Sequence, residues 1–412
     1  MSERGVVVTG LGLISPLGDD PAELHEALLA GQSGLKAIEL FDPSLLSTKR
    51  GGEIRPFEPE RYLGGRNLRP LDRTGRLLIS AAARALEDSG WTAEARDGGG
   101  DRELSLVVGT TYGSMHTIGE FDRRGLKLGP NYVSPFDFAN SVINAAAGQA
   151  AIWHKLTGVN STLSGGEASG LQAIAYAADL IRSGQTDVVL AGGVEELCLE
   201  SSLAYSRAGR LFDESQGGGP VPFDAARGGF APAEGAGLLV LEAAEVAEAR
   251  GARILARVAG SGAAFAPERK GDLSAALARA ILGAMAEMPA GRLVGVASGA
   301  SGARDLDAWE AEGIARGLAA AGAAGDLPVT AIKAQLGEAL GASGAFQAIG
   351  LIATLADGRL PGITGLNATD SDFPLPGASA ATRTVPLGAD ALALATAVSA
   401  DGPAMALLLA AP

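Results

Sequence analysis

Histidine and cysteine are scarce in this sequence, and their scarcity limits the chemistry that it can support. A single cysteine, Cys198, excludes an internal disulfide and a metal site built mainly from cysteine. The three histidines, His25, His116 and His154, all lie in the N-terminal part of the 412-residue chain. A mechanism that needs a histidine from the C-terminal half is therefore excluded.

Positive charge and long apolar runs are also in short supply. The chain has 33 Lys and Arg against 47 Asp and Glu, a formal net charge of −14, which argues against nucleic acids and anionic membranes as main partners. No apolar run reaches the roughly 18 residues that a membrane-spanning helix needs, and the N-terminus has no signal-peptide pattern. We therefore expect a cytoplasmic protein, and no pattern indicates a metal ion or another cofactor.

Aromatic residues make up only 5% of the chain, whereas 47% is hydrophobic and glycine occurs 59 times. This composition is typical of a compact α/β protein with close packing of helices on sheets. Strand and helix patterns alternate in both halves, and each half closes with a turn followed by an apolar strand, at 228–242 and 392–410. We predict one compact α/β unit of five layers, α-β-α-β-α, with pseudo-duplicated halves at 1–248 and 249–412.

The stretch from Gly158 to Gly193 is central to this organisation. It has the pattern of a strand, a sharp turn, a helix and a second, buried strand. Glu167 lies in the turn and is predicted to open the helix, where the partial positive charge of a helix N-terminus favours an anion. Enzymes place a Ser or Cys nucleophile at such a position. Here the side chain is a carboxylate, and its purpose decides the interpretation of the whole chain.

Five groups of residues, taken in chain order, resemble the motifs of one family. They are Val-Val-Val-Thr-Gly-Leu-Gly at 6–12, the turn and helix of 158–193, Val-Pro-Phe-Asp at 221–224, Phe-x-x-x-Glu-Gly-Ala-Gly at 230–237, and Lys333 with Gly-Ala-Ser-Gly at 341–344. Together they resemble the β-ketoacyl-acyl carrier protein synthases of the thiolase superfamily over essentially the whole chain. The resemblance implies a thiolase-like fold.

In members of that family that condense acyl chains, one cysteine and two histidines carry the chemistry. Glu167 stands at the cysteine of the T-A-C-x-x-G motif, and Gly299 stands at the histidine of the N-A-H-G-T motif. The family's second histidine follows a K-x-x-x-G pattern; here Lys333 is retained, but Glu338 follows the glycine. The family's G-F-G-G-T-N loop is replaced by residues 400–404. The resemblance therefore implies a degenerate active site without catalytic residues.

Elementary chemistry leads to the same expectation. Condensation needs a thiolate to carry the acyl group and two hydrogen-bond donors to stabilise an enolate. Gly299 has no side chain to donate, and a carboxylate at Glu338 would repel the enolate. On its own, this chain is predicted to be inert as a condensing enzyme.

A degenerate copy of this kind resembles the chain length factor, or KSβ subunit, of type II polyketide synthases. The resemblance implies a noncatalytic subunit that forms a heterodimer with an active ketosynthase. The two subunits would enclose an elongation tunnel, and an acyl carrier protein would bring the growing chain. The usual chain length factor has Gln where this chain has Glu167, which leaves both aromatic and polyene products open.

The helix that follows Gly113 and Ser114 corresponds by position to the tunnel wall of that family. Met115, Ile118 and Phe121 recur at helical spacing, and we predict that they line the tunnel and set its depth. Their alternative interpretation is an ordinary stripe of core residues.

Arg66, Arg69, Arg73 and Arg76 form the main local basic patch of an otherwise acidic chain. The patch is either a solvated helix face or a docking surface for an acidic partner such as the carrier protein.

Glu167 itself has a structural hypothesis and a catalytic one. In the first, it accepts hydrogen bonds from the helix N-terminus or pairs with Lys333. In the second, Glu167 and Lys333 are the acid–base groups of an independent decarboxylase or hydrolase. A further alternative for the whole chain is a homodimeric scaffold that recruits carrier protein through the arginine patch.

Overall fold

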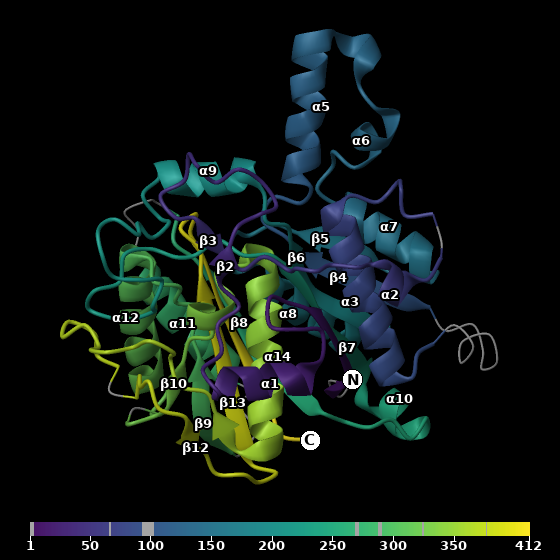
Figure 1. The fold of residues 1–412 in the computed structure, drawn as a ribbon. Helices are drawn as coiled ribbons and strands as arrows, with labels where there is room; N and C mark the ends of the chain where they lie inside the picture. Colours follow the sequence, from purple (N-terminus) through teal and green to yellow (C-terminus); the bar gives the residue numbers. More distant parts are fainter. Residues whose placement is uncertain are drawn as a thin grey trace.

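The computed structural model describes residues 4–65, 67–92, 103–267, 272–286, 291–323, 325–375 and 377–412. Within these residues, one ten-stranded sheet runs through the molecule, and helices lie on it and between its two halves (Figure 1). The layers follow the predicted order of helix, sheet, helix, sheet and helix.

The ten strands divide into two sets of five with the same connectivity. The first set is β1 (Val6–Ile14), β4 (Leu104–Gly109), β5 (Asn160–Leu163), β6 (Val188–Glu195) and β7 (Gly235–Ala243). The second set is β8 (Ala256–Phe265), β9 (Arg292–Ala297), β10 (Val329–Thr330), β13 (Ala391–Val398) and β14 (Pro403–Ala410).

The sheet order is β10-β9-β13-β14-β8-β1-β7-β6-β4-β5. If the strands of each set are numbered in chain order, both sets read 3-2-4-5-1 from the outer edge inward. Antiparallel pairing of β1 with β8 joins the two sets at the centre. The prediction of pseudo-duplicated halves is confirmed by this repeated topology.

Helices occupy three layers around the sheet. On the first half lie α3 (Arg73–Ser89) and α7 (Ala145–His154), and on the second half lie α11 (Leu273–Ala286) and α12 (Arg304–Ala320). Between the halves lie α8 (Ser169–Arg182) and α14 (Ser343–Asp357), which contact each other. The residues of the candidate site come from the N-terminal ends of these two inner helices and from the loops around them.

The remaining elements are short and connect or flank the layers. They are α1 (Pro21–Leu29), α2 (Glu60–Leu63), α9 (Leu199–Arg207), α10 (Ala244–Ala249), α13 (Lys333–Leu336), the 3-10 helix η2 (Leu340–Ala342), the pair β2 (Lys36–Ala37) and β3 (Arg50–Gly51), and the pair β11 (Arg359–Leu360) and β12 (Arg383–Thr384).

One segment projects from the layers. It consists of α5 (Met115–Leu128), the 3-10 helix η1 (Pro130–Tyr132) and α6 (Pro135–Ala139), and Figure 1 shows it extending from the top of the body. None of the residues of α5 is buried, and the helix packs on η1, α6 and α9. We call residues 115–139 the arm.

The elements at the centre of the molecule are buried because their residues are mostly apolar. Every residue of β7 is buried, as expected of a strand covered by helices on both faces. The stretch Leu340–Asp357 is the one described helical segment with the length and composition of a membrane span, although the sequence was expected to hold no apolar run of that length. Because 78% of it is buried inside the protein, it is placed as a core helix.

Candidate functional site

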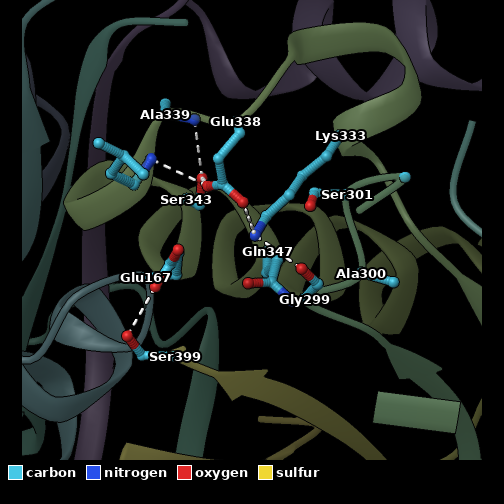
Figure 2. A network of polar contacts seen from close by, with 12 residues as sticks. Glu167, Gly299, Ala300, Ser301, Lys333, Glu338, Ala339, Ser343, Gln347 and Ser399 are labelled. Carbon is cyan, nitrogen blue, oxygen red and sulfur yellow. Dashed lines mark hydrogen bonds and ion pairs between the residues drawn. The ribbon is translucent and has the colours of Figure 1, made fainter. Parts of the chain in front are cut away.

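Glu167 lies on a tight turn that ends just before α8. The turn includes Gly166, whose φ of +61° places it in the left-handed region that favours glycine. The helix begins at Ser169 rather than at Glu167, and its N-cap, Ala168, makes no side-chain capping bond. The carboxylate of Glu167 instead accepts a hydrogen bond of 2.6 Å from Ser399 Oγ, in the turn between β13 and β14 (Figure 2).

The two structural hypotheses for Glu167 are therefore wrong in detail. Apart from its own backbone N–H, no N–H at the start of α8 donates to this carboxyl group in the described part of the chain, and its side-chain partner is Ser399 rather than Lys333. The physical reason is that the turn continues for two more residues, so that the helix begins at Ser169 and the Glu167 side chain points toward the β13–β14 turn. Nothing in the sequence pattern pointed to Ser399, which is 232 residues away.

Lys333 is engaged by another carboxylate. Its Nζ donates to Glu338 Oε2 and to the carbonyl oxygen of Gly299, each at 2.7 Å. Both side chains of this ion pair are almost fully buried, with 3% and 1% exposure. The second oxygen of Glu338 accepts from the backbone N–H of Leu340 and from Ser343 Oγ (Figure 2). Two of the positions singled out in the sequence thus form a closed ion pair.

Gly299 is packed against the end of β13. A Cβ added there would lie 2.9 Å from the carbonyl oxygen of Thr396 and 3.0 Å from Cα of Ala397. Its own N–H donates to Glu310 Oε1, which also accepts from Thr396 Oγ1. The place of the family's first histidine therefore has no room for a side chain.

The surroundings of Glu167 disfavour its charged form. Burial, and after it the negative charge of Glu338, raises the pKa of Glu167 above its ordinary value. A neutral carboxyl is a weak nucleophile, although it can donate or accept a hydrogen bond. Figure 2 shows Glu167, Gly299, Lys333 and Glu338 close together. Lys333 bonds to both Gly299 and Glu338, whereas the Glu167 carboxyl bonds to Ser399.

A cavity of about 500 Å³ opens beside Glu167. Among the side chains around it are Tyr112 and Tyr205, whose hydroxyl oxygens are 3.2 Å apart, together with Trp309 and Asp401. The described residues that line it include no cysteine and no histidine. Within the described residues, no group of three or more His, Cys, Asp or Glu side chains is arranged to hold a metal ion.

Met115, Ile118 and Phe121 lie on α5, the long helix of the arm. All three are half-buried, and Phe121 contacts Phe138 of α6 with ring centroids 5.8 Å apart. A core stripe would be buried on an internal face, and α5 has no buried residue. Their tunnel role remains a prediction.

The arginine patch is partly committed to internal contacts. Arg73 makes two bonds of 2.6 Å to the buried carboxylate of Glu234, and Arg76 donates to the carbonyl oxygen of Leu68. Arg69 is exposed, and Arg66 lies outside the described residues. Of the three arginines that the structure describes, Arg69 is exposed and Arg73 and Arg76 are half-buried. The docking role stays a prediction, and Arg73 is occupied by Glu234.

Two consecutive acids, Glu195 and Glu196, carried no prediction from the sequence. Glu195 is the last residue of the buried strand β6 and Glu196 comes directly after it, and both are buried. Acidic residues at the end of an apolar strand were the available signal.

Comparison with known proteins gives the chain its family. The model for the beta-ketoacyl synthase N-terminal domain matches residues 3–247, and the model for the C-terminal domain matches residues 248–367. The chain is 34% identical to the 3-oxoacyl-[acyl-carrier-protein] synthase 2 of Vibrio cholerae, with 88% of each chain covered. It is 32% identical to the tetracenomycin polyketide synthase ketoacyl synthase beta subunit of Streptomyces glaucescens, again over 88% of each.

Solved structures agree with these matches. The ishigamide ketosynthase/chain length factor superposes with a TM-score of 0.89 and 28% identity, and the comparison covers 100% of both chains. The family models span well over half of the chain, and the repeated five-strand topology, the inner helices and the residues at their N-terminal ends fit the same assignment. This chain belongs to the β-ketoacyl synthase family.

Proposed function

We propose that this protein is a noncatalytic, chain-length-determining subunit that pairs with an active ketosynthase in a type II polyketide synthase. The observation that carries the proposal is the closed contact between Lys333 and Glu338 beside a side-chain-free Gly299. With a carboxyl group at Glu167 in place of a thiol, and its pKa raised by burial, the site lacks the nucleophile and the donors that condensation needs. The likeness to a ketoacyl synthase beta subunit and to a ketosynthase/chain length factor supports the same role.

An exposed apolar surface supports a partner subunit. Of the fourteen large hydrophobic side chains that are exposed in the described residues, eight lie between residues 126 and 152, on the arm, α7 and the segment between them. They are Leu126, Leu128, Tyr132, Phe136, Phe138, Val142, Ile143 and Ile152. Apolar patches of this kind mark protein–protein contacts. Next in the chain comes β5, the outermost strand of the sheet on this side, whose free edge can pair with another strand.

The arm supports the length-setting part of the proposal. Its α5 carries Met115 and Ile118 on a helix that stands out from the body, where a partner subunit can close against it. In that arrangement, the size of these side chains limits how far an acyl chain extends. The partners are then the ketosynthase subunit and an acyl carrier protein with its growing chain, which yields an aromatic or polyene product.

The test is co-expression with a ketosynthase encoded beside this gene, followed by gel filtration and a chain-extension assay with carrier protein and a malonyl donor. We expect a 1:1 complex, longer products for Met115→Ala and shorter products for Ile118→Trp. Leu387→Ala, which trims an exposed apolar side chain outside the arm, is the matched control and should leave product length unchanged.

A homodimer that turns over acyl thioesters alone, and that loses this activity in Glu167→Gln, would overturn the proposal in favour of an independent enzyme. A homodimer that binds carrier protein without any turnover would favour the scaffold alternative.

A further inference from the structure

The position of α5 depends on residues outside the helix. Its N-cap residue, Ser114, makes no capping hydrogen bond with its side chain, and none of its residues is buried. A helix that neither caps itself nor buries a face relies on contacts from elsewhere to fix its orientation. Two consecutive residues at the end of β6, Glu195 and Glu196, supply such contacts.

Glu195 attaches the loop before α5 to the body. Its Oε2 accepts from the backbone N–H of Thr111 at 2.6 Å and from that of Gly341 at 3.2 Å. Its Oε1 accepts from the N–H of Tyr112 at 2.9 Å. One carboxylate therefore joins the loop before α5 to η2, whose Leu340 is bonded in turn to Glu338.

Glu196 holds the first turn of the helix. Its Oε1 accepts from the backbone N–H of His116 at 2.8 Å. Two further carboxylates lie at the same end: Glu200 of α9 is 3.3 Å from the His116 ring, and Asp72, before α3, accepts from Thr117 at 3.3 Å. A carboxyl oxygen at this end of a helix satisfies one of the free N–H groups of the first turn, with or without a charge on the carboxyl group.

Both residues of the pair are buried, and no cation is in direct contact with either of them in the described part of the chain. Glu195 is 1% exposed and Glu196 is 4% exposed, and neither forms an ion pair with any part of the chain that the structure describes. Burial of a carboxylate without a counter-charge lowers stability, as the raised pKa of Glu195, about 7, also shows. An arrangement that is unfavourable for stability but fixes one segment in place is expected where the position of that segment matters.

We propose that Glu195 and Glu196 are positioning residues for α5 and that the fidelity of product length depends on them. The proposal rests on the proposed function, in which α5 lines the tunnel. The 14 residues of α5 span about 21 Å, so a rotation of about 5° at its first turn moves its far end by about 2 Å. Loss of the Glu196 contact therefore displaces Phe121 more than Met115. The tunnel depth then varies, and the complex makes products of several chain lengths.

The experiment measures the distribution of product lengths made by the complex with the ketosynthase. This ratio does not depend on how much complex assembles. Glu196→Ala removes the acceptor of the His116 N–H, whereas Glu196→Gln keeps an oxygen at the same reach. Glu242→Ala is the matched control, because Glu242 is a fully buried carboxylate on β7 whose side-chain partners, Thr9 and Arg250, both lie outside α5.

We expect Glu196→Ala to raise the share of minor product lengths at least threefold, and Glu196→Gln to restore the wild-type distribution. An unchanged distribution in Glu196→Ala, or an equal change in Glu242→Ala, would overturn the proposal. If the alanine variant does not assemble, Glu196→Asp, which withdraws the carboxylate by one methylene, takes its place under the same criteria. Met115→Ala and Ile118→Trp, run alongside, separate the two proposals: if they leave length unchanged, the proposed function itself fails.

Discussion

The buried ion pair of Lys333 and Glu338 gives the sharpest prediction. If the pair has only a structural role, removing one partner should lower the free energy of unfolding, and removing both should cost much less than the sum of the two single changes. Lys333→Met strips the cation from a carboxylate that is 1% exposed, which should lower the free energy of unfolding by about 3–5 kcal/mol. Glu338→Gln leaves the Lys333 ammonium with only the Gly299 carbonyl oxygen as a partner. It should lower the free energy of unfolding by a similar amount, because a buried charge again loses its counter-charge.

The double variant should recover most of that loss. With Met at 333 and Gln at 338 no unpaired charge remains, and the amide oxygen can still accept from the Leu340 N–H and from Ser343 Oγ. We expect the double variant to lie within about 2 kcal/mol of wild type. Because the two single losses together come to at least about 6 kcal/mol, this corresponds to a coupling energy of about 4 kcal/mol or more between the two sites.

The assay is urea denaturation of the four proteins under identical conditions. Arg383→Met is the control, because the Arg383–Asp326 pair is exposed and should be worth no more than about 1 kcal/mol. If each single variant costs less than about 1 kcal/mol, or if the two costs simply add, the pair is not a closed structural contact. The catalytic alternative would then gain ground.

Further predictions concern the same site and its surroundings. Gly299→His should not create condensing activity and should instead reduce folded yield, because its Cβ meets the Thr396 carbonyl oxygen and Ala397; a soluble variant with turnover would contradict this. Ser399→Ala leaves the Glu167 carboxyl without its 2.6 Å donor and should raise the pKa of Glu167 further, a shift measurable by carboxyl-region infrared titration against the Glu167→Gln variant. Burial raises the pKa of Glu196 from 4.5 to about 8, so the folded chain holds this proton that the unfolded chain releases, and the stability contributed by Glu196 falls as pH rises between about 5 and 8. Thermal melts at several pH values should therefore show that Glu196→Gln loses less stability than the wild type between about pH 5 and 8, by up to about 3 kcal/mol. The same dependence of stability on pH in both proteins would refute the assignment. Arg73→Ala should destabilise the chain through the unpaired Glu234 rather than weaken carrier-protein binding selectively, which parallel melts and binding titrations would distinguish.

The features that the sequence could predict are the ones that repeat or that depend on local pattern. The alternation of strands and helices and the two closing hairpins identified the duplicated fold, because hydrophobic periodicity and glycine-rich turns are local signals. The positions of Glu167, Gly299, Lys333 and Glu338 could be read from motif spacing, and the structure brings all four together.

The partners of those residues could not be predicted in the same way. Ser399 bonds to Glu167 across 232 residues, and Glu234 bonds to Arg73 across 161. Such pairs depend on how distant parts of the chain pack together, and the local sequence pattern does not predict that packing. The start of α8 was misplaced for a local reason, since Gly166 adopts a left-handed conformation that continues the turn.

The crowded surroundings of Gly299 carry an evolutionary consequence. Because Thr396 and Ala397 of β13 fill the place that a side chain at 299 would need, a histidine there requires more than one substitution. The strand must withdraw at the same time, while the Lys333–Glu338 contact next to it holds the neighbouring loop where it is. A histidine introduced at 299 alone is therefore expected to give a less stable protein. Under the proposed function, sequence changes that alter product length are expected on the arm rather than at this site.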